Sequence, residues 1–488
     1  MVRVHPFLMK KTLLLLKTGV ISLSTQGTKG ANSFSQKWNR LSLGFHTGFI
    51  NVPRYLSSVA YGLEDTNKKI SPNLKNLSLD FIEWFRGFTD AEGCFLIVKT
   101  GSGFAFRFII KIHKDDLNTL YYIQNSLCGI GNMGAEEDLV HFKVTSLSEI
   151  KLIIEFFSNF PLNSSKRLDF LAFRRAYELY IASNQESRNE VLQEISEIKG
   201  SMNSKRTIYE EPLTQGLQDG NSHKIHITDN WLLGFIEGDG SFSIAKKDFI
   251  LTFSISQKGN LPLMEAIQNY LLNIPSLLKS GSCLEKLKGK TPIRNVIYLT
   301  KSKNKYASFS EATAFNYVLI IKSKDFINNI LIPYLDSLTF HSKKELDYLD
   351  WKFIGQLKKL GLHYLPEGIK LINLILSQMN NGRLSNSGSS LIDRDYIDLE
   401  LARLLNGPSN YELINGKIFI KSLNKFHIAR IKTQVELRNQ EDLVFKVFDS
   451  MNECAKFLGV STHTVTKRMK TGVPVTLNGK EYLIVKSI

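Results

Sequence analysis

An internal repeat constrains the fold of this chain more than any other feature of its sequence. Residues 85–97 (FRGFTDAEGCFLI) align with residues 232–244 (LLGFIEGDGSFSI), and the separation is 147 residues. Short matches continue downstream, between residues 123–125 and 267–269 and between residues 168–171 and 346–349. The separation grows from 144 to 178 residues along these matches, so we expect an insertion in the second copy, around residues 274–309. The repeat predicts two copies of one domain.

Both copies show the same succession of predicted elements. A short helix leads into an acidic glycine turn, and two strands, a helix, a further strand and two helices follow. Apolar and polar residues alternate along the second strand, which predicts a sheet with one apolar and one polar face. Helices must cover the apolar face, so we predict an α+β domain whose polar face can contact a large anion. The polar face is expected to carry Arg107, Lys111 and His113 in the first copy and Thr252, Ser254, Ser256 and Lys258 in the second.

The composition excludes several other classes of protein. A net charge of +16 favours an anionic partner, either nucleic acid or a membrane surface. The apolar run Leu13–Leu16 ends at Lys17, far short of the ~18–20 residues that a membrane span needs, so we expect no membrane insertion. The 31 Phe and 17 Tyr argue against a disordered chain. The four cysteines form no CxxC pair, which argues against a disulfide framework and against a zinc cluster.

The first 63 residues differ from the rest because they contain no Asp or Glu and eight Lys or Arg. A basic, acid-free segment rich in Ser and Leu is typical of a mitochondrial transit peptide. An unselected leader upstream of an embedded reading frame is the alternative. Both interpretations predict an organelle protein. In both, residues 1–78 are a leader and not part of a folded domain.

The two predicted short helices carry the candidate chemistry. Small residues lie four apart in each, at Gly87 and Ala91 and at Gly234 and Gly238, a spacing that lets two helices approach closely. Such packing would bring together Glu92 and Asp239, which end the two helices. Paired carboxylates repel each other unless a cation lies between them, and Mg2+ prefers such oxygen ligands. Two acids, metal and a basic surface suit the hydrolysis of two phosphodiesters.

Two other interpretations of these motifs remain open. A single acidic glycine motif could be a helix C-cap with Gly93 or Gly240 in a left-handed conformation, but two copies with the acid at the same place favour the metal site. The second acidic pair, Asp90 and Glu237, is expected to bond to backbone groups rather than to metal.

Residues 84–93 and 231–240 resemble the two signature motifs of LAGLIDADG homing endonucleases, in the two-motif, single-chain form found in organelle introns. The resemblance covers residues 79–362. It implies a pseudo-symmetric pair of αββαββα domains in a monomer, whose sheets form a saddle over a long, asymmetric site in double-stranded DNA. It also implies Mg2+-dependent cleavage of both strands across the minor groove.

The resemblance further implies roles for individual residues. Glu92 and Asp239 would bind metal, with the carbonyl groups of Gly93 and Gly240 as additional ligands. Gln257 matches the glutamine that organises water in the active site. The basic residue near the cleaved phosphate corresponds to Lys166 in one copy and to Lys343 or Lys344 in the other, although each lysine could instead be a solvated charge before a helix. Arg86 departs from the family pattern, which has a small residue there.

The C-terminal part of the sequence predicts a second DNA-binding element. Residues 380–403 are rich in Ser, Asn and Gly, which is typical of a linker. Residues 444–448 are predicted to form a strand, and residues 451–469 fit a helix-turn-helix. This segment resembles the small modular DNA-binding domains attached to many organelle homing nucleases. Its second helix would offer Thr462, His463, Lys467 and Lys470 to DNA.

The predicted domain organisation follows from these observations. It consists of a leader (1–78), a first domain (79–184), a linker (185–227), a second domain (228–362), a connector (363–440) and a helix-turn-helix module (441–488). The predicted function is that of a site-specific double-strand DNA endonuclease that promotes intron homing in mitochondria. The alternative is an intron maturase that binds intron RNA, with or without nuclease activity. A degenerate, inactive DNA-binding remnant is a third interpretation, against which the presence of both Glu92 and Asp239 argues.

Overall fold

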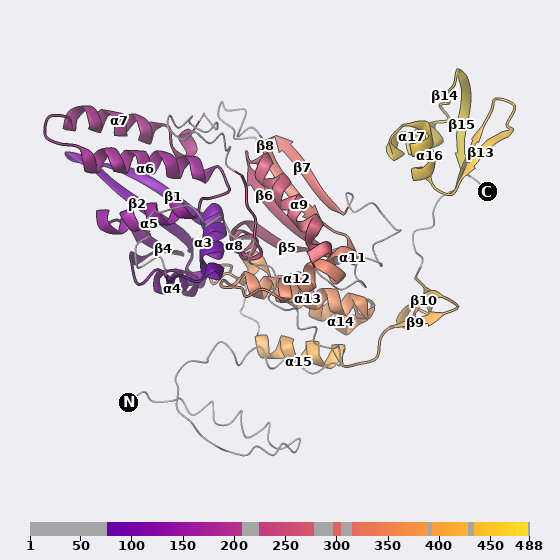
Figure 1. Ribbon diagram of the computed structural model, residues 1–488. Coiled ribbons are helices and arrows are strands. Elements are labelled where there is room, and N and C mark those ends of the chain that lie inside the picture. Colours follow the sequence, from indigo (N-terminus) through magenta and orange to yellow (C-terminus); the bar gives the residue numbers. More distant parts are fainter. Residues whose placement is uncertain are drawn as a thin grey trace, which may run out of the picture. The chain divides into compact units, whose positions relative to one another are not determined.

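The computed structural model describes residues 76–206, 224–277, 296–303, 315–388, 393–427 and 434–486 (Figure 1). Residues 1–75 of the predicted leader, and much of the predicted insertion, lie outside this part of the chain. Within it, no helix is both long and apolar enough to cross a membrane.

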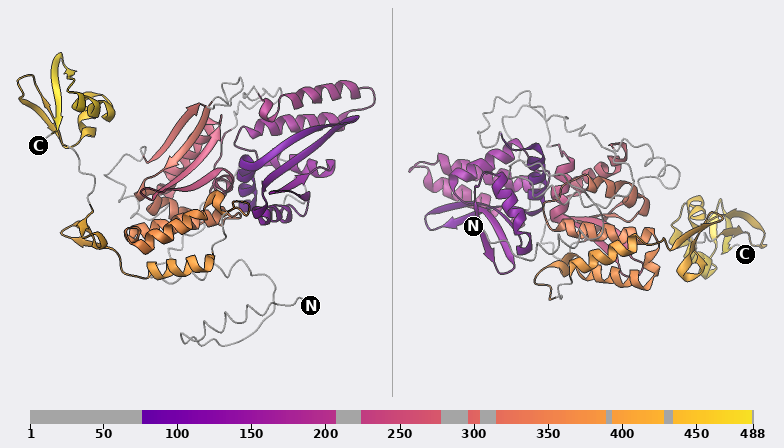
Figure 2. Two further views of the ribbon diagram at one scale, coloured as in Figure 1. Left: turned by 180° about the vertical axis from the view of Figure 1, so that it is seen from behind. Right: turned by 90° about the horizontal axis from the view of Figure 1, so that it is seen from below.

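The first domain is an antiparallel four-stranded sheet with helices packed against it. In chain order its elements are α3 (Leu79–Glu92), β1 (Gly93–Thr100), β2 (Gly103–His113), α4 (Leu117–Ser126), β3 (Asn132–Glu136), β4 (Leu139–Val144), α5 (Leu147–Asn159) and α6 (Lys166–Ala182). The strand order is β1-β2-β4-β3. Helices α4, α5 and α6 pack against the sheet, and α7 (Arg188–Gly200) packs on α6 (Figures 1 and 2).

The second domain repeats this arrangement. Its elements are α8 (Asp229–Asp239), β5 (Gly240–Ala245), β6 (Ile250–Lys258), α9 (Leu261–Leu277), β7 (Ile297–Lys303), β8 (Phe315–Ile321), α11 (Lys324–Phe326), α12 (Ile332–Asp336) and α13 (Lys344–Lys359). The strand order β5-β6-β8-β7 is that of the first sheet. A π-helical turn, Ile327–Leu331, joins α11 to α12. The predicted duplication and the predicted α+β class are confirmed.

The alternation predicted for the second strand is confirmed in both domains. Phe106, Phe108 and Ile110 on β2 are fully buried, whereas Arg107 is half-buried and Lys111 is exposed. On β6 the buried residues are Leu251, Phe253 and Ile255, and they alternate with Thr252, Ser254 and Ser256, which are half-buried or exposed. Each sheet therefore has one face in the core and one polar face.

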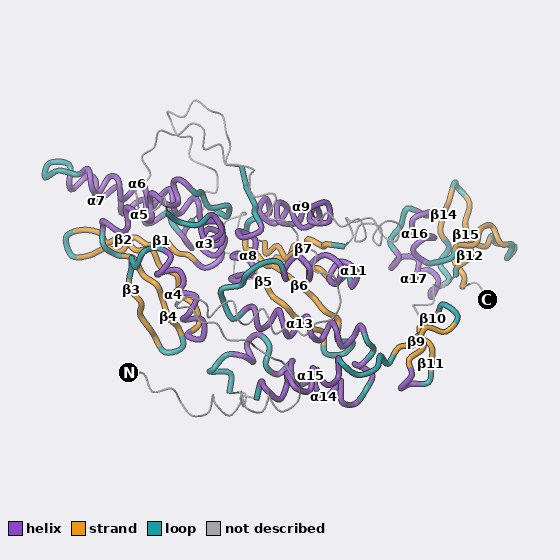
Figure 3. The backbone as a smooth tube through the Cα atoms, turned by 60° about the horizontal axis from the view of Figure 1, so that its bottom comes forward, coloured by secondary structure: helices purple, strands orange, loops and turns teal. Residues whose placement is uncertain are grey.

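Helices α3 and α8 pack directly against each other between the two sheets (Figures 1 and 3). Ser78 and Thr228 begin them, because each hydroxyl accepts a hydrogen bond from a backbone N–H of the first turn. A Cβ atom added to Gly87 would lie 1.9 Å from the Trp231 carbonyl oxygen, and one added to Gly234 would lie 2.1 Å from that of Trp84. The close backbone approach that the small residues predict is therefore present, and at these two positions only glycine fits.

Arg86 occupies a buried position in α3, where the family pattern has a small residue. Its Nη1 lies 2.7 Å from Glu83 Oε2, and its Nε and Nη2 donate to the Pro161 carbonyl over 2.9 and 2.6 Å. A buried ion pair and a backbone acceptor thus satisfy the guanidinium.

Ordered elements also fill segments for which linkers are predicted. Helix α7 lies in the predicted linker 185–227, and α14 (Pro366–Ser377) lies in the predicted connector. The linker prediction for residues 380–403 is wrong over its last part, because α15 (Arg394–Leu405) begins there. Its side chains Ile397, Leu401 and Leu404 are buried and belong to the main core. The segment is a helix because the helical spacing of these apolar residues outweighs the polar composition around them.

The C-terminal module has its own core. A small sheet precedes it, formed by β9 (Tyr411–Ile414), β10 (Lys417–Ile420) and β11 (Lys425–Phe426). The module itself consists of β12 (Val435–Arg438), β13 (Val444–Phe448), α16 (Met451–Leu458), α17 (Thr462–Thr471), β14 (Val475–Leu477) and β15 (Lys480–Lys486). Gly459 joins the two helices in a left-handed conformation (φ 66°), with Ala455 and Val465 buried beneath them. The predicted strand 444–448 and the two helices are present, and β12, β14 and β15 complete the sheet.

Candidate active site

The C-terminal ends of α3 and α8 bring together the two acids that the motifs predict. Glu92 is the last residue of α3 and Asp239 is the last residue of α8. A Cβ atom added to Gly238 would lie 2.3 Å from the Ala91 Cβ and 3.4 Å from Glu92 Oε1. The Glu92 carboxylate therefore lies against the residue that precedes Asp239.

The surroundings of the two acids make their charged forms costly. Burial raises the pKa of the Glu92 carboxyl above its ordinary value. Burial also raises the pKa of Asp239 to about 7, and the charge of Glu92 acts in the same direction. Two half-buried carboxylates that oppose each other's ionisation favour a bound cation.

Two lysines approach this pair from corresponding helices. Lys166 is the first residue of α6, and its Nζ donates to the carbonyl groups of Ala91 and Thr89 over 2.6 and 3.1 Å. Lys344 is the first residue of α13, and its Nζ donates to the Gly240 carbonyl over 2.9 Å. The positive charge of each lysine lowers the pKa of Glu92 and that of Asp239, against the effect of burial.

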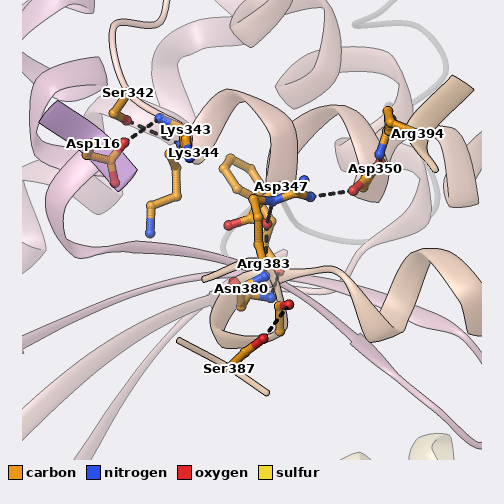
Figure 4. A network of polar contacts seen from close by, with 12 residues as sticks. Asp116, Ser342, Lys343, Lys344, Asp347, Asp350, Asn380, Arg383, Ser387 and Arg394 are labelled. Carbon is orange, nitrogen blue, oxygen red and sulfur yellow. Dashed lines mark hydrogen bonds and ion pairs between the residues drawn. The ribbon is translucent and has the colours of Figure 1, made fainter. Parts of the chain in front are cut away.

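Lys343 occupies a different place from Lys344 (Figure 4). Its backbone N–H donates to Asp116 Oδ1 over 2.7 Å, and its Nζ lies 4.0 Å from Asp115 Oδ1. The side chain is exposed and turned to the acidic residues of the first domain. Of the two candidates in the second domain, Lys344 is therefore the counterpart of Lys166.

Gln257 makes the two halves of the site unequal. Its Nε2 donates a short hydrogen bond to Asp239 Oδ2. The pairing of Gly240 with Ile255 and of Gly93 with Ile110 places Ile112 at the corresponding position of the first domain. The apolar side chain of Ile112 thus stands in the first domain where the amide of Gln257 stands in the second.

The two motif glycines are extended rather than left-handed. Gly93 has φ −71° and Gly240 has φ −77°, so the C-cap interpretation of the motif is wrong in this respect. Glycine is needed here because of crowding: a Cβ atom would lie 2.4 Å from Thr89 Cγ2 in one case and 2.5 Å from the Ile236 carbonyl oxygen in the other. The Gly240 carbonyl, a candidate metal ligand, accepts the hydrogen bond from Lys344.

The donor set fits a hard divalent cation that shares its coordination with substrate. Among the described residues, no three His, Cys, Asp or Glu side chains come together as a complete metal site. Mg2+ does not need such a cage, because it keeps several waters and binds through one or two carboxylates and substrate phosphates. Glu92 and Asp239 are the two carboxylates that would hold such an ion.

The second acidic pair bonds to backbone groups, as predicted. Asp90 accepts hydrogen bonds from the N–H groups of Asn163 and Ser164, over 2.9 and 2.8 Å. Glu237 accepts one from the N–H of His341, over 3.0 Å. Sequence reasoning missed their other partners, the indole groups of Trp231 and Trp84. The signal for them was the Trp that stands at the start of both motifs.

The candidate DNA-contacting residues differ in how free their side chains are. Lys111 is paired with Glu136 over 2.5 Å, and His113 Nδ1 accepts a hydrogen bond from the N–H of Asp115. Arg107, Thr252 and Ser254 are half-buried, whereas Ser256 and Lys258 are exposed. In the C-terminal module, Thr462 donates to Asn452 over 2.7 Å, and His463, Lys467 and Lys470 are exposed on one face of α17.

Several known proteins are similar to this chain in sequence. Residues 85–177 match the family model described as LAGLIDADG endonuclease. The uncharacterised mitochondrial protein RF1 of Saccharomyces cerevisiae is 26% identical over 448 residues, which cover 90% of this chain and 87% of that protein.

Two further relatives are named as probable intron-encoded endonucleases. Endonuclease 3 of Neurospora crassa is 27% identical over 343 residues, or 64% of this chain and 57% of its own length. Cox1-I1b of Schizosaccharomyces pombe is 30% identical over 205 residues, or 40% of this chain and 50% of its own length. The chain thus spans about half the length of these two relatives.

Among solved structures, the LAGLIDADG homing endonuclease I-GzeII in complex with its DNA target is 24% identical, with a TM-score of 0.47. The match covers 62% of this chain and 99% of that one. The family match covers residues 85–177 of the first domain, and the second domain repeats the strand order of that domain, so the chain is similar to LAGLIDADG endonucleases in this region.

Proposed function

We propose that this protein is a mitochondrial, site-specific DNA endonuclease that cuts both strands of a long, asymmetric target across the minor groove and so promotes intron homing. The observation that carries the proposal is the meeting of Glu92 and Asp239, each with a half-buried lysine from its own domain, at the end of a two-helix contact. The names of the fungal relatives, mitochondrial or intron-encoded, support the location and the reaction class.

Each half of the site has one acid and one lysine, and each half would cleave one DNA strand. Glu92 and Asp239 would hold Mg2+, which supplies an activated water and stabilises the leaving oxygen. Lys166 and Lys344 neutralise charge at the scissile phosphates. Gln257 orients the Asp239 carboxylate through its side-chain amide. The backbone carbonyl of Gly93 is a further oxygen ligand on the first side.

The polar faces of the two sheets are the proposed surface for duplex DNA. Arg107, Lys111 and His113 would contact one half of the target, and Thr252, Ser254, Ser256 and Lys258 would contact the other. The difference between a basic set and a hydroxyl-rich set suits an asymmetric target, because the two half-sites then meet different donors and acceptors. A single chain with two such domains acts as a monomer.

The test is a cleavage assay of the full chain with Mg2+ on a DNA library of candidate intron-insertion junctions. We expect the wild type to cut both strands at one site. Glu92→Gln and Asp239→Asn should abolish cleavage while DNA affinity, measured with Ca2+, is retained. Glu178→Gln is the matched control, because this exposed carboxylate on α6 pairs with Arg174 of the same helix rather than with Glu92 or Asp239.

Two outcomes would contradict the proposal. Cleavage that survives in both acid variants would remove the acids from catalysis. Tight binding of the wild type to a structured intron RNA, without any DNA cleavage, would identify a maturase instead.

The C-terminal module is proposed as a second DNA contact. His463, Lys467 and Lys470 lie at helical spacing on the exposed face of α17. Lys467→Ala should weaken DNA binding and reduce the slope of log affinity against log salt by about one unit, if it contacts a phosphate. Lys480→Ala, an exposed lysine in the β14–β15 hairpin, is the control. An unchanged slope in Lys467→Ala and Lys470→Ala would exclude α17 from the interface.

A further inference from the structure

A second repeated motif lies beyond the ends of the two domains predicted from the sequence. Residues 202–206 read Met-Asn-Ser-Lys-Arg, and residues 379–383 read Met-Asn-Asn-Gly-Arg. The asparagine is left-handed in both, with φ 57° at Asn203 and φ 53° at Asn380. Asparagine is among the few non-glycine residues that adopt this conformation readily.

The two motifs make the same contacts. The backbone N–H of Asn203 donates to Asp169 Oδ1 over 2.8 Å, and its side-chain Nδ2 donates to the Phe95 carbonyl over 3.0 Å. Asn380 repeats both bonds, to Asp347 Oδ1 over 2.8 Å and to the Phe242 carbonyl over 3.0 Å.

The arginine of each motif completes the arrangement, which is visible for the second domain in Figure 4. Arg206 Nε donates to Asp169 Oδ1 over 2.9 Å, and Arg383 Nε donates to Asp347 Oδ1 over 2.9 Å. We call each set an Asn–Asp–Arg cluster: residues 203, 169 and 206 in the first domain, and residues 380, 347 and 383 in the second.

Each cluster joins the strand that follows an acid to the helix that begins with a lysine. Phe95 lies on β1, three residues after Glu92, and Phe242 lies on β5, three residues after Asp239. Both strands are sheet edges, so their outer carbonyl groups need partners from outside the sheet.

The aspartates of the clusters connect to the lysines through their helices. Asp169 and Asp347 come three residues after Lys166 and Lys344, and residues at this spacing share one face of a helix. A displacement of the cluster therefore moves the acid and the lysine of one half of the site relative to each other.

We propose that Asn203 and Asn380 are positioning residues, and that each fixes the acid–lysine geometry for cleavage of one DNA strand. The proposal rests on the proposed function. Displacements of about 1 Å at a reacting group can cost about 100-fold in rate, so a single hydrogen bond that holds an edge strand can matter for catalysis.

The cluster of the second domain has a further acidic partner. Asp350 pairs with Arg383, and also with Arg394 Nη1 over 2.5 Å. Ala172 stands at the position of Asp350 in the first domain, so the two clusters differ in sequence there.

Glycine substitutions test this inference without straining the backbone. Asn203→Gly and Asn380→Gly keep the left-handed conformation and the N–H bond to aspartate, but they remove the bond to the strand carbonyl. Asn415→Gly is the matched control, because Asn415 is also left-handed (φ 51°) but lies exposed in the β9–β10 turn.

The readout is strand-resolved, single-turnover cleavage of the target duplex selected by the junction library. Asn203→Gly should slow one strand about 10-fold or more. Asn380→Gly should slow the opposite strand, so that each variant accumulates a different nicked intermediate. DNA affinity in Ca2+ should stay within about twofold of the wild type. Hydrogen exchange should become faster in residues 93–100 for Asn203→Gly and in residues 240–245 for Asn380→Gly.

The outcomes separate this inference from the function on which it rests. Equal slowing of both strands by either variant would identify the clusters as purely structural and overturn the proposal, as would unchanged rates. A wild type that cuts neither strand would overturn the proposed function, and the positioning role would fall with it.

Discussion

Trp84 and Glu237 meet across the contact between α3 and α8, where the indole Nε1 donates to the carboxylate Oε1 over 2.8 Å. Trp231 makes the equivalent bond to Asp90 over 2.9 Å. All four side chains are buried. Each domain therefore supplies a hydrogen-bond donor to a carboxylate of the other, and that carboxylate also holds the loop before its own domain's lysine-bearing helix.

Removal of the indole donor should destabilise the protein beyond the loss of ring volume. Trp84→Phe leaves the buried Glu237 with one partner fewer, a change worth about 1–3 kcal/mol in the free energy of unfolding. Trp351→Phe is a matched control, because Trp351 is fully buried and its Nε1 has no hydrogen-bond partner among the described residues. Urea unfolding followed by circular dichroism would compare them, and equal losses would show that the indole bond contributes nothing.

A methyl group in the helix contact should separate the two domains. Gly87→Ala places its Cβ against the Trp231 carbonyl, which is backbone and cannot turn aside, so we expect a loss of stability of about 3 kcal/mol or more. Gly200→Ala is the control: this glycine also lies in a helix, but a Cβ there meets no atom within 4 Å. Alanine favours a helix over glycine by about 1 kcal/mol, so Gly200→Ala should be neutral or stabilising. A thermal melt of Gly87→Ala that matches the wild type would contradict the close approach of the helices.

The asymmetry between Gln257 and Ile112 should appear as an order of strand cleavage. Gln257→Ala removes the amide that orients Asp239, so one strand should be cut about 10-fold or more slowly while the other is little affected. Ile112→Ala is the control, because it changes the corresponding position without removal of a polar group. Strand-specific end labels would measure both rates. Equal slowing of the two strands by Gln257→Ala would show that its role is not confined to one half.

The thiols of Cys128 and Cys454 should differ in reactivity. Cys128 is exposed, whereas Cys454 is buried in the C-terminal module, and burial raises the pKa of its thiol to about 11. Iodoacetamide at pH 8.5 should therefore modify Cys128 and leave Cys454 unmodified until the module unfolds. Peptide mass spectrometry checks this, and rapid labelling of Cys454 in the folded chain would contradict its place in the core.

The raised pKa of the Cys454 thiol also predicts how the stability of the C-terminal module changes with pH. Between pH 9 and 11 the unfolded chain loses the Cys454 proton before the folded chain does, so the module should become less stable as the pH rises. Cys454→Ala should lose this part of the pH dependence.

The sequence alone predicts those features that depend on local patterns. A helix is predicted after the first two strands of each copy, and α4 (Leu117–Ser126) lies there in the first domain, because the apolar spacing is local information. The repeat likewise predicts the meeting of α3 and α8, since Gly87 and Gly234 mark their contact.

The remaining features depend on contacts between distant segments. Which of Lys343 and Lys344 faces the two acids depends on the residue at which α13 begins. A hydrogen bond from the Lys343 backbone N–H to Asp116 of the first domain helps to set that residue. The helix at Arg394–Leu405 is ordered through its burial against the main core. Gly93 and Gly240 are extended because β1 and β5 begin at them, and the motif letters do not distinguish this from a left-handed cap.

The contact between α3 and α8 also has a consequence for synthesis of the chain. Trp84 and Glu237 are 153 residues apart, so α3 leaves the ribosome long before its partner exists. Until α8 emerges, the first domain exposes the tryptophan, phenylalanine and glycine backbone of α3 that the second domain covers in the folded chain. Translation thus passes through a stage at which a nearly complete first half exposes apolar surface of the kind that promotes aggregation.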